Sequence, residues 1–271
     1  MHTVIRRSSG WTSLNLTEIW RYRELLLFFA WRDILVRYKQ TVIGVVWALI
    51  RPAISLAVLV FVFSRLAKLP SDGVPYPLLA LAGLLPWQLF SNGFGESSAA
   101  ILGGSSMISK IYFPRIIAPL SATIGSLVDL VITFGLVTLL MLYYGFKPGW
   151  QIAALPFFIA LCMVFTCGLG VLFSALIVKY RDLRHVIPFV LQIGLYVSPV
   201  GFSSSIVPAR YQLLYSINPM VSIIDGFRWS LLGTKPPDPV ALAIGTGVTI
   251  LSLVVGAFYF KRTEREFADI I

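Results

Sequence analysis

The feature that most limits the fold of this chain is a series of six long apolar stretches separated by short polar segments. A helix needs about 20 apolar residues to cross the hydrocarbon core of a bilayer. Five of the stretches clearly suffice, and the fifth in chain order is marginal. We therefore expect six transmembrane helices, at residues 42–64, 76–94, 116–143, 152–178, 186–202 and 240–260.

The composition agrees with a chain that is dissolved in lipid. Hydrophobic residues make up 57% of the sequence and charged residues only 13%, against roughly 25% charged residues in soluble domains. Neither an internal repeat nor a polar linker divides the chain. The sequence therefore predicts an all-α polytopic membrane protein that forms one domain, residues 1–271.

The positions of the basic residues predict the orientation of this domain. Of the 22 Lys and Arg residues, 15 lie in the four polar segments that share one side of the membrane if every stretch crosses it. Lys and Arg in short loops are retained on the cytoplasmic side during insertion. Both termini are thus expected in the cytoplasm, and the net charge of +10 needs no nucleic-acid partner.

The sequence lacks the residue patterns needed for metal binding, for a disulfide and for ATP hydrolysis. Cys162 and Cys167 are five apart on one expected helix and point in divergent directions, and His2 lies far from His185. No G-x-x-x-x-G-K-[ST] phosphate loop is present. We predict no metal site, no cofactor bound by this chain and no ATPase activity of its own.

Residues 15–40, before the first stretch, are expected to form an amphipathic helix that lies on the membrane surface. Apolar side chains recur on one side of this helix and Arg21, Arg32 and Lys39 on the other. A soluble cytoplasmic helix is the alternative. The apolar stripe consists of Trp20, Leu27, Trp31, Ile34 and Tyr38.

The cytoplasmic segment 105–115 ends in aromatic residues beside cations, a combination that suggests a docking surface for another protein. The alternative is that the aromatic rings only anchor the loop in the lipid headgroups. The candidate docking residues are Ser109, Lys110, Ile111, Tyr112, Phe113, Pro114 and Arg115.

The external segment between the last two stretches carries two apolar pieces, 211–217 and 220–232, that are too short to cross a bilayer. The intervening Asn218-Pro219 breaks them apart, so we expect two short interfacial or re-entrant helices. Asp225 and Arg228 are three residues apart and are expected to pair on one helix face.

Asp129 lies near the middle of the third stretch, where an ionised carboxylate costs about 2.5–3.5 kcal/mol. We expect a compensating pair with Arg51 of the first stretch. A proton relay through Asp129 is the alternative.

Aromatic residues in or beside the stretches offer flat surfaces over which the C–H faces of a sugar chain would slide. Packing and the interfacial aromatic belt are the alternative interpretations. The candidates for a channel lining are Trp47, Trp87, Phe90 and Tyr196.

Eight segments, in the same order along nearly the whole chain, together resemble the membrane subunit of bacterial ABC exporters of lipid-linked polysaccharide, the O-antigen export permease family. They are the RYKQT of 37–41 running into 44–47, PSDGVPYP of 70–77, GLLPW of 83–87, KIYFPR of 110–115, KYRDLRH of 179–185, NPM of 218–220, GFRW of 226–229 and FAD of 267–269.

The resemblance implies a homodimer in the bacterial inner membrane, bound to two copies of a separate ATPase that holds ATP and Mg²⁺. It also implies that segment 105–115 is a helix coupling to the ATPase, and that residues 211–232 gate the exit, with Asp225, Arg228 and Trp229 as candidates. Arg51 departs from the Gln expected in similar chains.

The cargo implied is a lipid-linked polysaccharide, and its diphosphate end would be attracted to Arg37 and Lys39. Export of capsule or teichoic acid is the alternative within this class. A proton-coupled secondary transporter that uses Asp129 is the alternative of another class. A membrane-embedded glycan-transfer enzyme is disfavoured because the acidic residues are scattered.

Overall fold

The computed structural model describes residues 16–39, 44–104, 113–264 and 267. Within these residues the chain is helical and contains no strand, which confirms the all-α prediction. The elements are α1 (Leu16–Arg21), α2 (Arg23–Lys39), α3 (Gly44–Leu59), its π-helical continuation η1 (Val60–Leu66), α4 (Tyr76–Gly103), α6 (Ile117–Tyr143), the 3-10 helix η2 (Trp150–Ala154), α7 (Leu155–Lys179), α8 (Leu183–Val197), the 3-10 helix η3 (Ser204–Ile206), α9 (Ala209–Tyr215), α10 (Pro219–Leu232) and α11 (Pro239–Thr263).

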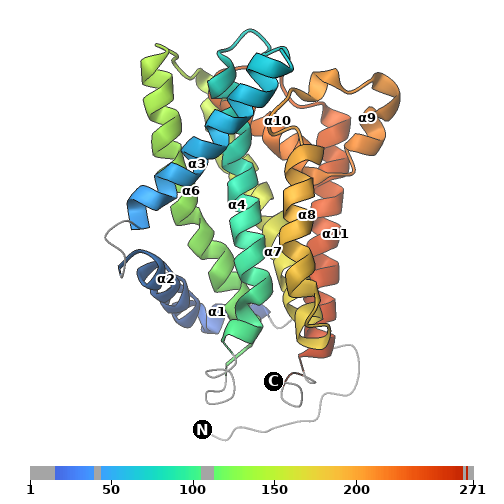
Figure 1. Ribbon diagram of the computed structural model, residues 1–271. Coiled ribbons are helices and arrows are strands. Elements are labelled where there is room, and N and C mark those ends of the chain that lie inside the picture. The colour runs from blue at the N-terminus through green and yellow to red at the C-terminus, as the bar shows by residue number, and fades with distance from the viewer. Residues whose placement is uncertain (1–15, 40–43, 105–112, 265–266, 268–271) are drawn as a thin grey trace, which may run out of the picture.

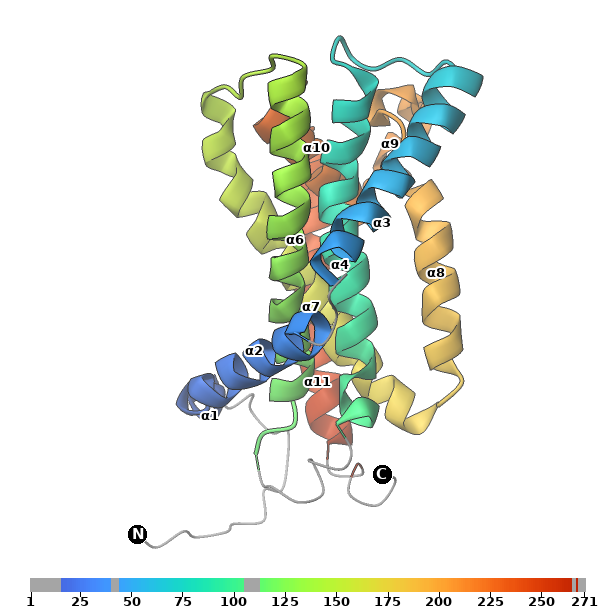
Figure 2. The same ribbon diagram turned by 60° about the vertical axis from the view of Figure 1, so that its left-hand side comes forward.

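The long helices form one bundle in which successive members run in opposite directions (Figure 1). Helices α3, α4, α6, α7, α8 and α11 extend along the bundle, with α3 strongly tilted. Helices α1 and α2 lie across one end, which we call the α2 end, while α9 and α10 lie at the other, the α10 end (Figures 1 and 2). The helices with long apolar segments thus run along the bundle, and the helices too short to cross a bilayer lie at its two ends.

Among the residues that the structure describes, four segments are long and apolar enough to cross a membrane: Val46–Leu66, Ile117–Tyr143, Trp150–Lys179 and Pro239–Thr263. Helix α8 is shorter than the predicted stretch 186–202, because regular helix ends at Val197. Its 15 residues span only about 22 Å at 1.5 Å per residue.

Helix α4 is the centre of the bundle and packs against α3, α6, α7, α8 and α10. At 28 residues it runs nine residues beyond the predicted end at Phe94. The extension is stable because its serines are buried: the Ser97 hydroxyl donates to the Pro119 carbonyl at 2.9 Å. Helix α4 therefore carries the polar segment that follows Phe94 into the packed interior.

The expected N-terminal helix is divided at Tyr22 into α1 and α2. Trp20, Leu27 and Trp31 of the predicted stripe are at least 60% exposed, whereas Phe29, outside that stripe, is buried. Helix α2 thus packs through Phe29 and leaves an apolar face uncovered, as a helix at a lipid surface does.

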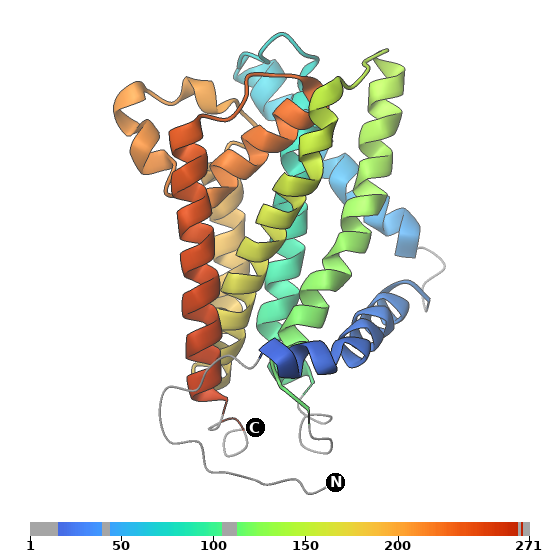
Figure 3. The ribbon, with the colours of Figure 1, turned by 180° about the vertical axis from the view of Figure 1, so that it is seen from behind.

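Helices α7 and α11 lie side by side (Figure 3) and touch through facing glycines. A Cβ on Gly256 would meet the Gly168 carbonyl oxygen at 2.3 Å, and a Cβ on Gly168 would meet the Leu253 backbone nitrogen at 2.6 Å. Small residues allow such close backbone approach between membrane helices. The pair therefore fixes the distance between α7 and α11.

We predict that Gly256→Ala destabilises the protein by about 1–3 kcal/mol, because the new methyl group has to displace rigid backbone. The melting temperature of the purified protein in detergent is the measurement. Gly247→Ala, on the same helix, is the matched control, since a Cβ there meets nothing within 4 Å. Equal melting temperatures for the two variants would contradict close α7–α11 packing.

Candidate functional site

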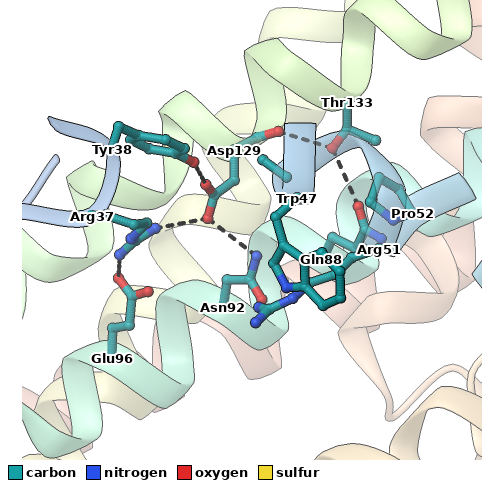
Figure 4. Close-up of a pocket in the computed structure, with 11 residues that line it drawn as sticks. Arg37, Tyr38, Trp47, Arg51, Pro52, Gln88, Asn92, Glu96, Asp129 and Thr133 are labelled. Carbon is teal, nitrogen blue, oxygen red and sulfur yellow. Dashed lines mark hydrogen bonds and ion pairs between the residues drawn. The ribbon is translucent and has the colours of Figure 1, made fainter. Parts of the chain in front are cut away.

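Near the α2 end, a cluster of polar side chains connects α2 to the long helices α4 and α6. Helix α2 packs along α6, so the last turn of α2 brings Arg37 and Tyr38 to Asp129, which lies halfway along α6 (Figure 4). Helix α4 supplies Asn92 and Glu96 from the opposite side. Three helices that are distant in sequence thus meet at one carboxylate.

Asp129 is 15% exposed and accepts hydrogen bonds from three side chains. Arg37 Nη1 donates to its Oδ2 at 2.9 Å, Asn92 Nδ2 donates to the same oxygen at 3.1 Å, and the Tyr38 hydroxyl donates to Oδ1. Charge-assisted hydrogen bonds of this kind compensate a carboxylate that has left water. The geometry therefore gives Asp129 a structural role.

Arg37 is shared between two helices, because its Nη2 also forms an ion pair with Glu96 of α4. Burial alone would lower the pKa of Arg37, but the carboxylates of Glu96 and Asp129 outweigh it and the pKa is raised. Burial and the hydrogen bond to Asp129 raise the pKa of Tyr38 to about 12. At neutral pH both side chains are consequently protonated donors.

The cluster forms one wall of a cavity of about 630 Å³ between α2, α3, α4 and α6. Trp47, Arg51 and Pro52 of α3 form the facing wall, with Gln88 and Thr133 beside them (Figure 4). The lining contains two guanidinium groups and two carboxylates, so its formal charge is balanced. The arrangement suits polar contacts and holds no nucleophile–base pair.

The cation paired with Asp129 is Arg37, and the expected Arg51–Asp129 pair is wrong. Arg51 lines the same cavity, but its guanidinium lies 6.0 Å from the ring centre of Trp47, a cation–π distance. The physical reason is that α2 packs against α6 and its last turn brings Arg37 and Tyr38 to Asp129. Arg37 and Asp129 are 92 residues apart, and no sequence spacing predicts such a contact. For the same reason, the places of Glu96, Asn92 and Tyr38 in this cluster were not predicted.

The four candidate channel aromatics separate into two groups. Trp87 and Phe90 are 6% and 7% exposed and belong to the core, where Phe90 stacks on Phe94 and Phe165. Trp47 and Tyr196 are at least half exposed. Only these two remain available to a polymer outside the subunit.

Of the candidate coupling residues, Ser109, Lys110, Ile111 and Tyr112 lie outside the described residues. Phe113 is buried edge-on against Phe29 of α2, with ring centres 5.4 Å apart. Pro114 is half-buried and precedes α6. The end of this segment is therefore packed directly against α2.

Arg115 connects the same segment to the end of α11. Its backbone N–H donates to Glu264 Oε1 at 3.1 Å, and its guanidinium donates to the Glu264 carbonyl at 2.7 Å. Glu264 also forms an ion pair with Lys261 at 3.0 Å. Arg115 thus links the start of α6 to the end of α11.

At the α10 end, Arg228 is 3% exposed and holds the chain that follows α8. Its Nη2 donates to the Val200 carbonyl at 2.9 Å, its Nη1 to the Phe202 carbonyl at 2.8 Å, and its Nε to the Leu79 carbonyl of α4 at 3.2 Å. Val200 and Phe202 lie in the non-helical segment after α8, so Arg228 supplies hydrogen-bond donors to carbonyls outside regular helix.

The expected pairing of Asp225 with Arg228 is present, with 4.0 Å between Asp225 Oδ1 and Arg228 Nη1. Trp229, the third gate candidate, packs edge-on against Trp150 of η2. The Val200 backbone and the Arg228 side chain lie close to α4 at Gly83, where a Cβ would meet the Val200 carbonyl oxygen at 2.7 Å. The three candidates consequently connect α10 to different neighbours.

The fold and the sequence define a family. The family model described as ABC-2 type transporter matches residues 24–232, which is more than half of the chain. The chain therefore belongs to the ABC-2 type transporter family. Members of this family are membrane permease subunits that work with an ABC ATPase, so the chain is a multi-pass membrane permease.

Curated relatives match almost the whole chain. An O-antigen export system permease, RfbA of Myxococcus xanthus, is 27% identical over 94% of this chain and 98% of its own length. RfbA of Klebsiella pneumoniae is 25% identical over 92% and 95%. The polysialic acid transport protein KpsM of Escherichia coli is 22% identical over 86% and 91%.

We predict that Arg37→Gln lowers stability by about 1–3 kcal/mol, because two carboxylates lose their charged donor. Thermal unfolding of the purified protein measures the effect. Arg23→Gln on the same helix is the control, since Arg23 is exposed.

Adding Glu96→Gln and Asp129→Asn to Arg37→Gln should recover part of the loss, because neutral amides need no compensating cation. An Arg37→Gln variant no less stable than Arg23→Gln would contradict the bridging role of Arg37.

Proposed function

We propose that this permease is the channel-forming subunit of an ATP-driven exporter that moves a lipid-linked polysaccharide from the cytoplasm to the periplasm, with O-antigen as the favoured cargo. The observation that carries the proposal is the match to permeases named for O-antigen export over more than nine tenths of the chain. Capsular polysaccharide is the second cargo, favoured by the match to KpsM.

Six crossings fit the arrangement of the bundle. Beyond the four long apolar segments, α4 is long enough to cross, and its polar residues Gln88 and Asn92 line the cavity between α2, α3, α4 and α6. Helix α8 crosses together with the turn residues 198–202, whose carbonyls at 200 and 202 accept from Arg228. The six crossings alternate in direction, as Figure 1 shows for the helices.

The orientation follows from charge. Arg23, Arg115, Arg181 and Lys261 are among the cations at the α2 end, which we assign to the cytoplasm under the positive-inside rule. The α10 end then faces the periplasm. Helix α2 is the interfacial helix in this arrangement, and both termini are cytoplasmic.

A homodimer bound to two ATPase subunits is the assembly we propose. Helix α3, its continuation η1 and helix α8 present large apolar side chains outward, among them Trp47, Phe61, Phe189 and Tyr196. Among the described elements, α8 makes its contacts mainly with α4 and α7 and stands at the side of the bundle. A second copy facing α3 and α8 would enclose a path for the polymer between the two subunits.

The ATPase would act through segment 105–115. Phe113 packs on α2, and Arg115 is bonded to the end of α11, so displacement of this segment moves both helices. Arg37 then transmits motion of α2 to α4 and α6. Because Arg37 already forms ion pairs with two carboxylates, we do not propose it as a binding residue for the diphosphate end of the cargo.

We predict that a strain lacking this gene loses its surface polysaccharide chains and that the gene restores them only with an active partner ATPase. Gel electrophoresis of cell-surface glycans with immunodetection measures the export. An ATPase variant that binds but cannot hydrolyse ATP should leave lipid-linked polymer inside the cell. Wild-type surface polysaccharide in the deletion strain would contradict the proposed function.

We further predict that Lys110→Glu weakens binding of the ATPase and lowers export several-fold, because it reverses a charge on the coupling segment. Co-purification with the ATPase and the export assay give the two readouts. Arg262→Glu is the control, because Arg262 is an exposed cation at the same end. The docking assignment fails if both variants bind and export alike.

A further inference from the structure

A second cavity, of about 360 Å³, lies at the α10 end and takes no part in the cluster around Asp129. Its walls come from η3, α9, α10, the 234–238 segment and the start of α11, with one residue from the turn before α4. The polar side chains that line it include Asp72, Gln212, Ser216, Ser222, Asp225 and Asp238.

Many donors around this cavity are already used within the protein. The Ser216 hydroxyl donates to the Gln212 carbonyl at 2.6 Å, and the Ser222 hydroxyl donates to the Pro219 carbonyl at 3.1 Å. The Tyr215 hydroxyl donates to the Val197 carbonyl at 2.9 Å. The oxygens of these hydroxyls keep acceptor capacity toward the cavity.

Carboxylates add to this excess of acceptors. Asp225 has Arg228 at 4.0 Å and a hydrogen bond from the Ser204 side chain, and the three guanidinium nitrogens of Arg228 also donate to backbone carbonyls. Asp238 caps α11 with one oxygen, Oδ1 to Val240 N at 3.1 Å, and has a second oxygen. The cavity therefore offers a ligand carboxylate and hydroxyl oxygens as acceptors, and Thr234 and Lys235 are among its donors.

The charge of the lining narrows the ligand class. Three carboxylates, of Asp72, Asp225 and Asp238, face two cations, Arg228 and Lys235. A phosphate or another anion would meet a net negative lining. Within the described part of the chain, no three acidic, His or Cys side chains are grouped as a metal site requires.

We propose that this cavity binds one or two neutral sugar units of the polysaccharide at its exit from the membrane, an inference that rests on the proposed function. Sugar hydroxyls both donate and accept, so they suit the carboxylate and hydroxyl oxygens of the lining as well as donors such as Lys235. Val221, Pro236 and Pro237 give the apolar wall that the C–H face of a sugar ring needs. The volume lies within the range of about 300–1,000 Å³ typical of small-molecule sites.

The site also adjoins the segment that follows α8. Asp225 and Arg228 line the cavity, and Arg228 donates to the carbonyls of Val200 and Phe202. A bound sugar therefore lies next to the backbone whose position defines the end of α8. The sugar site is therefore formed in part by the proposed gate segment 211–232 of each subunit.

Saturation-transfer NMR on the purified permease–ATPase complex in lipid nanodiscs tests the site. The probe is the set of neutral tri- and tetrasaccharide fragments released by mild acid from the surface polysaccharide of the host strain. Glucose 1-phosphate is the anionic probe. We expect saturable binding of the neutral fragments and none of glucose 1-phosphate.

Two variants locate the binding. Gln212→Trp fills the cavity from α9 and should weaken fragment binding by about tenfold or more. Leu213→Trp, next to it and 64% exposed, is the matched control and should bind like the unsubstituted chain. Asp72→Asn removes one carboxylate at a residue with φ of +52°, a conformation that Asn tolerates, and should also weaken binding.

Absence of saturable fragment binding, equal binding by the Gln212→Trp and Leu213→Trp complexes, or preference for glucose 1-phosphate would overturn the proposal. Restoration of surface polysaccharide by the unsubstituted gene is scored separately. Failure of that restoration overturns the proposed function, whereas restoration without fragment binding overturns the sugar site alone.

Discussion

The double ion pair of Arg37 is the interaction on which the α2 end depends. One guanidinium on the helix that lies across the bundle forms ion pairs with both Glu96 of α4 and Asp129 of α6. Separating α2 from either partner would leave a carboxylate without its cation inside a protein of low charge, which is strongly unfavourable. Helix α2 is thus fixed to the bundle by charge as well as by the packing of Phe29.

A second arginine has a corresponding role at the α10 end, but its partners are backbone carbonyls. Arg228 joins α10 to the segment after α8 and to Leu79 of α4. Helix α4 therefore contacts both arginine clusters, through Leu79 near one end and Glu96 near the other. A displacement that begins at α2 can therefore pass along α4 to α10, which belongs to the gate segment 211–232.

The sequence predicted the features that depend on local spacing. The apolar lengths predicted the positions of the long helices, although α4 runs nine residues beyond its predicted end, and the three-residue spacing of Asp225 and Arg228 predicted their pairing. The break at Asn218-Pro219 separates α9 from α10, where the Asn218 side chain accepts from Met220 N and caps α10.

Features set by packing between distant segments were not predicted. The need of Asp129 for a cation was clear, but the choice between Arg37 and Arg51 depends on where α2 docks. Trp87 and Phe90 are typical of a channel lining by composition, yet the central position of α4 buries them. The extension of α4 beyond Phe94 depends on Ser97 meeting the Pro119 carbonyl, 22 residues away.

The central claim is that ATP hydrolysis by a partner drives polysaccharide export while Asp129 serves as a structural carboxylate. Its most direct test is transport of lipid-linked polymer in proteoliposomes that contain the permease with its ATPase. We expect transport to require ATP, to continue when an uncoupler abolishes the proton gradient, and to persist in an Asp129→Asn variant that remains folded. Transport by the permease alone, driven by a proton gradient and abolished by Asp129→Asn, would contradict the account.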